Sequence, residues 1–506
     1  MISVADLIDR TFVRYPQNVA VVDGERSETV AQVEDRVRRL ANAIAALTPE
    51  AAPRVGVLLR NSLEYIEIDL AITLAGATKV PINPRLSDDE RAFIINDSGA
   101  SLLFTEEAEL ERVLDHRSDC PALESVVNVG RPRPGVHDYE ALLAGARPDR
   151  LVLSSAEDRL HTILYTSGTT GRPKGAMLLD SCRIAALTMS LSEEYAPGQS
   201  DGMIHAGPLT HGSGSKVLTY FSRGARNVVL QKFDPGAFWR AVEESGGTSS
   251  FVVPTMIRML IDDLASTGRR APERLANLSY GGAGISAGEL SDAIETFGGR
   301  MTQVYGLSEV PHPIAVLRHR DVIGEVPTYP VVPAGHPVSG VETRIGGTES
   351  SQRGELYVRG ANVMAGYWNQ PEATAQTIDA DGWFRTGDAV EVDSLGRIYI
   401  VDRTKDLIIS GGMNVYPAEV ERVIREHPAV VDVCVVGVPS EKWGETVAAA
   451  VVTSSPTGED DVASWCAGRL ADYKRPRIIM MADALPQGST GKIQKRSVRE
   501  MVARTR

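Results

Sequence analysis

The segment YTSGTTGRPKG, at residues 165–175, combines flexible backbone and several hydrogen-bond donors with a cation at Lys174. Its glycines allow a ligand to approach the backbone closely, its hydroxyls and amides can donate hydrogen bonds, and Lys174 supplies a charge suited to phosphate. The pattern predicts a loop that binds a polyphosphate. It is not a P-loop, because two residues rather than four separate Gly168 from Gly171 and because a glycine follows Lys174. Taken alone, the segment is also compatible with an ordinary surface loop.

Two other short segments could bind the rest of a nucleotide. In QVYGLSE, residues 303–309, Tyr305 offers a flat face for a base and Glu309 offers oxygen ligands for a hard cation. In GWFRTGD, residues 382–388, the carboxylate of Asp388 could accept hydrogen bonds from both hydroxyls of a vicinal diol such as a ribose. Each segment also has a plain structural explanation, as a Tyr-Gly turn with a surface glutamate and as a turn or helix-cap aspartate.

The C-terminal part of the sequence adds cations and further flexible backbone. The stretch DRTKDLIISGGMNVYPAE, residues 402–419, contains the donor fork of Arg403 and the pair Gly411–Gly412. The two glycines would let a ligand approach the backbone, and they would equally suit the turn of a hairpin. Lys492, in LPQGSTGKIQ, ends a flexible loop from which it could reach an anion, although a lone lysine is usually only solvated.

Composition and charge exclude several classes of function. At 506 residues the chain is long enough for about three structural units. Its net charge of −13 argues against nucleic-acid or anionic-membrane binding, although residues 485–506 carry six Lys or Arg against one Glu. The four cysteines form no C-x-x-C pair, which disfavours a zinc site or a disulfide framework. No apolar run is long enough to span a membrane, and the N-terminal segment contains acidic residues, so we expect a cytoplasmic protein.

The elements that must position these residues follow an α/β pattern. Short apolar runs at 19–24, 54–59, 101–106 and 125–130 indicate buried strands, and they alternate with amphipathic segments such as 35–47 and 63–77 that indicate helices. A Pro- and Gly-rich stretch at 321–350 precedes short alternating segments, GELYVRG and GRIYIVD, which are typical of antiparallel strands or a small barrel. From about Asp402, a helix, a long strand and a second helix at 461–472 predict a separate C-terminal α+β domain.

The order of these motifs resembles that of the adenylate-forming superfamily, and specifically of AMP-forming acyl- or aryl-CoA synthetases. The resemblance extends over nearly the whole chain and also includes PLTHGSG at 208–214 and GGAG at 281–284. It implies an α/β fold in which a large N-terminal domain, residues 1–402, contains two α/β subdomains plus a β-barrel. It also implies a small mobile α+β C-terminal domain, residues 403–506.

The reaction implied by the resemblance has two steps and uses ATP, Mg²⁺ and coenzyme A. A carboxylate attacks the α-phosphate of ATP to give an acyl-adenylate and pyrophosphate, and the thiol of coenzyme A then displaces AMP. The first step needs positive charge and donors around the developing pentavalent phosphate. It needs no general base, because a carboxylate is already ionised at pH 7.

The resemblance assigns a role to each motif. The phosphates would contact Thr166, Ser167, Gly168, Thr169, Thr170, Gly171 and Lys174, and Thr169 and Glu309 would also position magnesium. The adenine would lie among Gly281, Gly282, Ala283, Tyr305, Gly306 and Ser308. Asp388 and Arg403 would bind the ribose. Lys492 would bridge the α-phosphate and the substrate carboxylate.

The second step implies a rotation of the C-terminal domain about Lys405. The rotation would withdraw Lys492 and bring Gly411, Gly412 and Met413 to the tunnel for pantetheine. Contacts with the nucleotide of coenzyme A vary in the family, and Lys474, Arg475 and Arg477 are candidates for them.

The acyl pocket would be lined by small residues and by a histidine that gates it, at His211, Gly212, Gly214, Pro254, Gly282 and Gly284. A wall of small residues predicts a roomy pocket for an aromatic, bulky or medium- to long-chain acid rather than acetate. Five alternatives are considered at this point: an enzyme that stops at the acyl-adenylate, a ligase that loads an acyl carrier protein, an amino-acid-activating domain, a phosphotransferase and a non-catalytic nucleotide-binding protein. The amino-acid-activating domain is disfavoured, because no acidic residue lies between Pro208 and Arg223 to pair with an ammonium group. The missing P-loop pattern disfavours the phosphotransferase, and a homo-oligomer is compatible with the sequence.

Overall fold

A computed structural model describes residues 2–50, 52–153, 158–166, 172–321, 332–350, 352–403, 406–410, 413–440, 443–488 and 493–504. The chain divides into two compact units. The first unit comprises Met1–Val326, Ala334–Thr343 and Val358–Phe384, and the second comprises Pro327–Pro333, Arg344–Tyr357 and Arg385–Arg506. This division assigns residues 385–402 to the C-terminal unit, whereas the domain boundary at 402/403 stays a prediction from the sequence.

The first unit contains a nine-stranded sheet with a parallel centre. Its strand order is β16-β15-β14-β13-β12-β10-β11-β1-β2. The strands are β16 (His336–Pro337), β15 (Ala315–Arg318), β14 (Met301–Tyr305), β13 (Asn277–Tyr280), β12 (Ser249–Val252), β10 (Gly202–His205), β11 (Arg226–Val229), β1 (Val19–Asp23) and β2 (Arg26–Thr29). Neighbours from β14 to β1 pair in parallel, and β15, β16 and β2 add antiparallel edges.

The second sheet of the first unit has seven strands in the order β7-β6-β5-β3-β4-β8-β9. These are β7 (His137–Asp138), β6 (Ser125–Val129), β5 (Leu102–Glu106), β3 (Arg54–Leu58), β4 (Thr78–Pro81), β8 (Leu160–Thr166) and β9 (Lys174–Leu179). All neighbours pair in parallel except β8 and β9, which form an antiparallel hairpin. The four apolar runs that the sequence analysis interpreted as strands are β1, β3, β5 and β6. Their sequences are apolar because helices bury these strands on both faces of a parallel sheet.

Local sequence signals account for the helices of the first unit. Helix α2 (Val30–Leu47) buries Val33, Val37 and Leu40, spaced by one helical turn, and a capping box from Thr29 starts it. Helix α3 (Leu63–Leu74) is buried nearly all round and is not the amphipathic helix that the sequence predicts, because its buried residues include Glu67 and Asp69, which pair with Arg36 and Lys79. The other helices of this unit are α1 (Val4–Arg14), α4 (Asp88–Ser98), α5 (Glu107–Asp115), α6 (Tyr139–Gly145), α7 (Asp180–Met189), α8 (Val217–Phe221), α9 (Pro235–Glu243), α10 (Pro254–Thr267), α11 (Ala287–Phe297) and α12 (Pro371–Thr377).

The second unit contains most of a four-stranded sheet, in the segment for which the sequence predicts a β-barrel. Its strand order is β17-β18-β19-β20. The strands are β17 (Val341–Ser350), β18 (Arg353–Gly360), β19 (Phe384–Val392) and β20 (Ile398–Arg403). The α/β class and the large N-terminal and small C-terminal parts are confirmed.

The C-terminal part of the second unit is a five-stranded sheet with helices on both faces. Its strands follow the order β22-β21-β24-β23, with β25 also paired to β24. Alternate residues of β23 and β24 pack on opposite faces: Val433 and Val435 contact a cluster from α13 and α14, whereas Cys434 and Val436 join Val498 of α15. The elements are β21 (Ile408–Ser410), β22 (Met413–Val415), α13 (Pro417–Arg425), β23 (Val430–Ser440), β24 (Gly444–Thr453), α14 (Glu459–Ala467), β25 (Ile478–Met481) and α15 (Lys495–Arg504).

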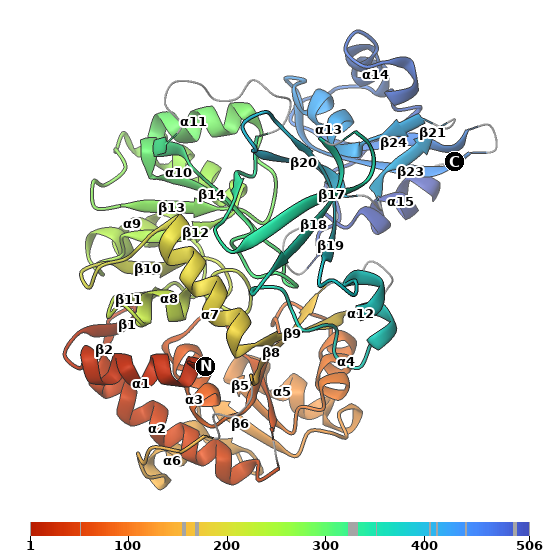
Figure 1. The fold of residues 1–506 in the computed structure, drawn as a ribbon. Coiled ribbons are helices and arrows are strands. Elements are labelled where there is room, and N and C mark those ends of the chain that lie inside the picture. Colours follow the sequence, from red (N-terminus) through yellow and green to blue (C-terminus); the bar gives the residue numbers. More distant parts are fainter. Residues whose placement is uncertain are drawn as a thin grey trace. The chain divides into compact units, whose positions relative to one another are not determined.

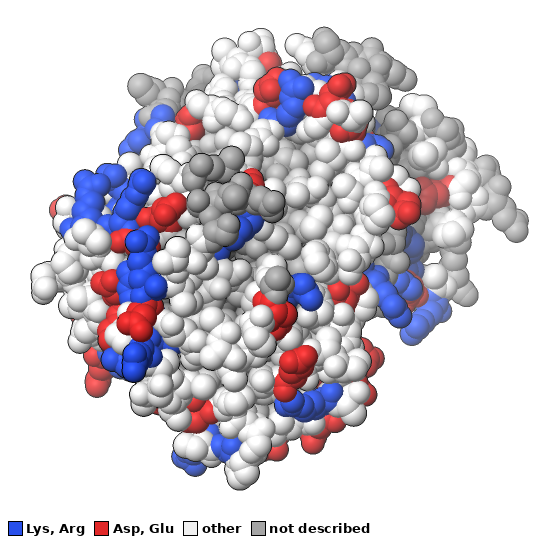
Figure 2. Space-filling model, turned by 60° about the horizontal axis from the view of Figure 1, so that its bottom comes forward, with Lys and Arg blue, Asp and Glu red and all other residues white. Residues whose placement is uncertain are grey.

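Charge is mixed on the face of the molecule drawn in Figure 2. Acidic and basic side chains lie close together there, between larger areas of uncharged residues. Within the part of the chain that the structure describes, no helix is long and apolar enough to cross a membrane.

Candidate active site

One edge of the nine-stranded sheet gathers the predicted adenine and acyl-pocket residues. Strands β10, β12, β13 and β14 are parallel neighbours, so their carboxyl ends lie at the same edge (Figure 1). The segments that follow them are 206–215, 253–257, 281–284 and 306–313, which contain the predicted residues His211, Gly212, Gly214, Pro254, Gly281, Gly282, Ala283, Gly284, Gly306 and Ser308. Ligands of α/β sheets bind at this edge, because the connecting loops there are free to contact them.

The glycines at the end of β13 are required by the backbone itself. A Cβ atom on Gly281 would lie 2.2 Å from the carbonyl oxygen of Val304, the residue before Tyr305 at the end of β14. Gly282 has a φ of +77°, a conformation that favours glycine. Gly282, Ala283 and Gly284 are exposed, so their backbone is open to a planar base beside the end of β14.

The predicted phosphate loop begins and ends on a hairpin of the other sheet. Thr166 is the last residue of β8 and pairs with Lys174, the first residue of β9. Ser167, Gly168, Thr169, Thr170 and Gly171, which connect these strands, lie outside the described residues. The hairpin thus fixes both ends of the predicted loop, and the described Thr166 and Lys174 flank it.

Tyr367 connects the predicted magnesium ligand with the predicted phosphate ligand, and the sequence analysis missed it. Its hydroxyl donates a hydrogen bond to Oε1 of Glu309 at 3.0 Å, and Nζ of Lys174 lies 5.1 Å from the centre of its ring. Burial and the neighbouring Glu309 raise the pKa of Tyr367 well above its usual value, so its hydroxyl stays a donor. The segment that carries it runs beside β9, through a bridge between Tyr367 and Ala176.

These contacts orient the Glu309 carboxylate. The N–H of Met364 also donates to the backbone oxygen of Glu309 at 2.9 Å, so the 364–367 segment holds both the backbone and the side chain of this residue. Carboxylate oxygens suit Mg²⁺, which prefers hard oxygen ligands and keeps several waters or phosphate oxygens. The donor set at Glu309 therefore fits a magnesium ion bound together with ATP phosphates.

An aromatic pair lies beside Gly212 in the wall of the predicted acyl pocket. The rings of Phe251 and His312 are stacked, with centres 5.1 Å apart and planes at 7°. Nε2 of His312 lies 3.1 Å from the hydroxyl of Ser215. Burial lowers the pKa of His312 well below its usual value, so this ring is neutral. His211 lies in the same wall, with Nδ1 2.8 Å from the hydroxyl of Thr210.

Three glycines at this edge of the sheet are packed against neighbouring atoms and do not face open space. A Cβ atom on Gly212 would lie 2.8 Å from the ring of Phe251, and one on Gly214 would lie 1.9 Å from the backbone oxygen of Leu209. Gly281 is likewise packed against the Val304 carbonyl. These glycines permit close packing of the wall, whereas a Cβ on Gly284 would meet nothing within 4 Å. Sequence alone does not distinguish a glycine that opens space from one that a neighbour occupies.

The second unit brings the two predicted ribose ligands together. Asp388 on β19 pairs across the sheet with Arg403 on β20, and Arg403 Nε lies 2.8 Å from Asp388 Oδ1. The Asp388 side chain is only 2% exposed, whereas that of Arg403 is 41% exposed. Arg403 also donates to the backbone oxygen of Thr386 at 3.2 Å, which fixes the plane of its guanidinium group. The pair could present an oriented carboxylate to two hydroxyls.

The remaining predicted residues of the second unit are only partly described. Met413 is exposed at the start of β22, while Lys405, Gly411, Gly412 and Lys492 lie outside the described residues. The three candidates for contacts with the coenzyme A nucleotide each have a protein partner. Lys474 pairs with Glu419, Arg475 donates to the backbone of Leu470, and Arg477 pairs with Asp472.

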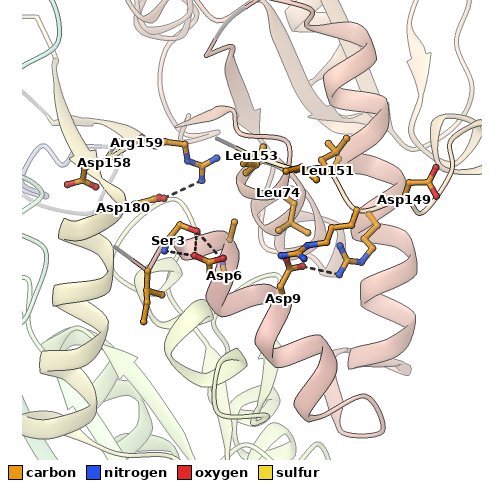
Figure 3. A pocket seen from close by; sticks show the side chains of 16 residues that line it. Ser3, Asp6, Asp9, Leu74, Asp149, Leu151, Leu153, Asp158, Arg159 and Asp180 are labelled. Atoms are coloured by element: carbon orange, nitrogen blue, oxygen red, sulfur yellow. Dashed lines mark hydrogen bonds and ion pairs between the residues drawn. The ribbon is translucent and has the colours of Figure 1, made fainter. Parts of the chain in front are cut away.

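A cavity of about 160 Å³ lies elsewhere in the first unit, beside the start of α1 (Figure 3). Its lining includes Asp9, Arg150 and the ion pair between Arg159 and Asp180. Its described lining contains none of the site residues predicted from sequence. It is therefore separate from the predicted nucleotide and acyl sites.

Comparison with known proteins agrees with this arrangement. Residues 8–368 match the family of AMP-binding enzymes, and residues 419–492 match the C-terminal domain of AMP-binding enzymes. The chain belongs to the AMP-binding enzyme family. Its similarity extends over nearly the whole chain, which agrees with the ordered series of motifs.

Two curated members of the family have related activities. A feruloyl-CoA synthase from Amycolatopsis sp is 35% identical over 96% of this chain and 96% of its own length. A medium/long-chain fatty-acid–CoA ligase from Mycobacterium tuberculosis is 33% identical over 94% of this chain and 86% of its own length. This family member is thus an AMP-forming acid–CoA ligase.

A solved family structure supports the cofactors. O-succinylbenzoate coenzyme A synthetase from Bacillus subtilis, in complex with ATP and a magnesium ion, superimposes with a TM-score of 0.86 at 27% identity, over 97% of this chain and 99% of that one. The ligase uses ATP, Mg²⁺ and coenzyme A.

Proposed function

We propose that this ligase activates an aromatic or otherwise bulky carboxylic acid, or one with a medium to long chain, and transfers the acyl group to coenzyme A. The observation that supports this proposal is the Phe251–His312 stack, an uncharged flat surface between segments that leave the same sheet edge. An aromatic ring or a hydrocarbon chain gains free energy by packing against such a surface, whereas acetate offers almost no apolar area. The substrates named for the two curated relatives fall into the same classes.

In the proposed first step, a carboxylate oxygen of the acid bonds to the α-phosphorus and the bond to the pyrophosphate oxygen breaks. Thr166, Lys174 and the loop between them would hold the phosphates, and Glu309, oriented by Tyr367, would hold the metal ion that neutralises them. Asp388 would accept the ribose hydroxyls, and Lys492 would bridge the α-phosphate and the acid. Each of these residues would act through its charge or by holding a reactant in position.

In the proposed second step, the sulfur of coenzyme A bonds to the acyl carbon and AMP leaves with the electron pair of the broken acyl–oxygen bond. The proton of the thiol is released to water in this step. We place the hinge at Lys405 and the pantetheine contacts at Gly411, Gly412 and Met413, so that one site serves both steps in turn. Coenzyme A is the proposed acceptor, in preference to a carrier protein, and four free cysteines support a reducing, cytoplasmic location.

The experiment is pyrophosphate exchange against a panel of acids, followed by thioester formation with and without coenzyme A. The panel includes acetate, propionate, benzoates, cinnamates and fatty acids of increasing length. We expect kcat/KM to rise by orders of magnitude from acetate to the aromatic or long-chain acids. A preference for acetate or propionate would refute the proposed substrate class, and exchange without any thioester would refute coenzyme A as the acceptor.

A further inference from the structure

Lys495 lies among three carboxylates in the second unit. It is the first residue of α15, and its Nζ lies 3.5 Å from Oδ2 of Asp406 and 3.8 Å from Oδ1 of Asp402. Glu421 is the third carboxylate that acts on it. Burial opposes the charge of Lys495, but these three acids outweigh it and raise the pKa of the side chain. The lysine therefore stays charged in a partly buried position.

The carboxylates around Lys495 are themselves fixed to other elements. Asp402, at the end of β20, accepts hydrogen bonds from the N–H groups of Arg403 at 2.7 Å and of Ala418, in the first turn of α13, at 2.9 Å. Glu421 accepts from the N–H of Val435 on β23 at 2.8 Å. Lys495 thereby connects the start of α15 with β20, α13 and β23, and its removal would leave like charges facing one another.

This network bears on function because Lys495 follows directly after the loop that carries Lys492. The loop that carries Lys492 is closed at its base by an antiparallel bridge between Gln487 and Ile493, and the N–H of Gln494 donates to the backbone oxygen of Pro486 at 2.8 Å. Lys495 follows directly and pairs with Asp402 and Asp406, the two acids on either side of residues 403–405. One side chain thus joins the base of the Lys492 loop to both ends of the proposed hinge.

We propose that Lys495 is a positioning residue, whose ion pairs with Asp402 and Asp406 fix the base of the Lys492 loop so that Lys492 is correctly placed for adenylate formation. The proposal rests on the function proposed above for Lys492. Lys495 itself contacts no reacting atom in this account. Because a small displacement of a catalytic group can cost about a hundredfold in rate, the loss of an anchor so close to Lys492 has a measurable effect.

The test measures the two half-reactions separately in the full-length enzyme, with an acid that the wild type activates. Lys495→Met is expected to lower kcat of pyrophosphate exchange by about ten- to a hundredfold, with the KM for ATP and thioester formation from supplied acyl-adenylate nearly unchanged. Lys495→Arg restores most of the activity, because it keeps the charge. Arg496→Met is the matched control: Arg496 is on the same helix, its side chain is 78% exposed and it pairs only with Glu500 among the described ion pairs. The Arg496→Met variant is expected to leave the rates of both half-reactions unchanged.

A double variant distinguishes this proposal from the role of Lys492. In a Lys492→Ala background, adding Lys495→Met should cause no further loss of adenylation, because the anchor acts through Lys492. An additive loss, or an equal loss of both half-reactions in Lys495→Met, would overturn the positioning role and leave the role of Lys492 intact. Full adenylation activity in Lys492→Ala would overturn both the positioning role of Lys495 and the proposed role of Lys492. Should Lys495→Met fail to fold, Asp406→Asn removes one ion pair at constant shape and must show the same selective loss.

Discussion

Asp388 is a nearly completely buried carboxylate, and a buried charge is tolerated only when a partner compensates it. Arg403 is that partner on the neighbouring strand, and the sequence predicted both residues as ribose ligands. Their pairing across β19 and β20 could not be derived from the sequence, because the register of two strands depends on their packing as well as on their pattern.

Replacement of Asp388 by alanine is predicted to abolish recognition of the ribose. Each lost hydrogen bond to a charged acceptor is worth about 1.5–3 kcal/mol, so kcat/KM for ATP should fall at least about a hundredfold. Wild-type enzyme should prefer ATP to 2′-deoxy-ATP, and Asp388→Ala should treat the two alike. Arg385→Ala, which breaks the exposed pair with Glu355 in the same sheet, serves as the control. A variant that still discriminates between the two nucleotides would place the ribose elsewhere.

Tyr367 was missed because its partner Glu309 lies 58 residues away in the sequence and no spacing rule links them. The segment NVMAGYW shows only an aromatic residue after a glycine, which is common in loops. The contact exists because residues 365–368 pair with β9, and only the folded chain reveals that pairing.

Tyr367→Phe is predicted to weaken the use of magnesium while leaving the packing of the ring intact. The loss of one hydrogen bond to a carboxylate, worth about 1.5–3 kcal/mol, should raise the Mg²⁺ concentration for half-maximal adenylation by about ten- to a hundredfold. Tyr139→Phe removes a similar phenol–carboxylate bond, to Glu67, and should leave the magnesium dependence unchanged. An identical magnesium profile for Tyr367→Phe and wild type would show that this contact does not orient a metal ligand.

Strand β10 illustrates how elements hold the acyl-pocket wall in place. Its last residue, His205, is fully buried, with Nε2 2.8 Å from Oδ1 of Asn227 on β11 and Nδ1 2.9 Å from the hydroxyl of Ser213. The imidazole thus fixes the 206–215 segment to the sheet. Burial lowers the pKa of His205 to about 4, so protonation is disfavoured in the folded state.

The unfolding free energy should therefore depend on pH through this residue. Because the pKa of His205 is lower in the folded than in the unfolded chain, its stabilisation is complete above about pH 6.5 and is lost as the pH falls toward 4. Its contribution should decrease by about 2 kcal/mol between pH 7.5 and pH 5. In urea unfolding, the free energy of unfolding of His205→Gln should decrease between pH 7.5 and pH 5 by about 2 kcal/mol less than that of the wild type. The variant His137→Gln, at an exposed histidine, should show the same decrease as the wild type. If the free energy of unfolding depended on pH equally in all three proteins, the claim that His205 is a buried neutral imidazole would be contradicted.

Strands and helices could be predicted from the sequence wherever the burial of an element determines which of its residues are apolar. Strands β1, β3, β5 and β6 carry short apolar runs because helices cover both faces of their sheets, and β23 carries a long apolar run for the same reason. The glycine-rich wall was harder, since Gly212 and Gly284 look alike in sequence but face a phenylalanine ring and open space, respectively. Packing partners decide such positions.

The two compact units each present part of the proposed machinery. The first carries the described acyl wall, the Thr166–Lys174 hairpin and Glu309, and the second carries Asp388, Arg403 and the Lys495 network. The series of motifs allowed the family to be recognised from sequence, because the order of binding elements is fixed by the topology of the fold. The particular acid was not accessible in this way, since it depends on the shape of a wall built from four separate loops.

The central claim is that a carboxylate oxygen of the substrate attacks the α-phosphorus of ATP in this enzyme. The direct measurement uses the preferred acid of the panel, labelled with ¹⁸O in its carboxylate, together with ATP, Mg²⁺ and coenzyme A, and mass spectrometry of the nucleotide product. The predicted result is AMP that carries one ¹⁸O atom, formed in equal amount with pyrophosphate and thioester. Unlabelled AMP, or ADP as the product, would contradict the account.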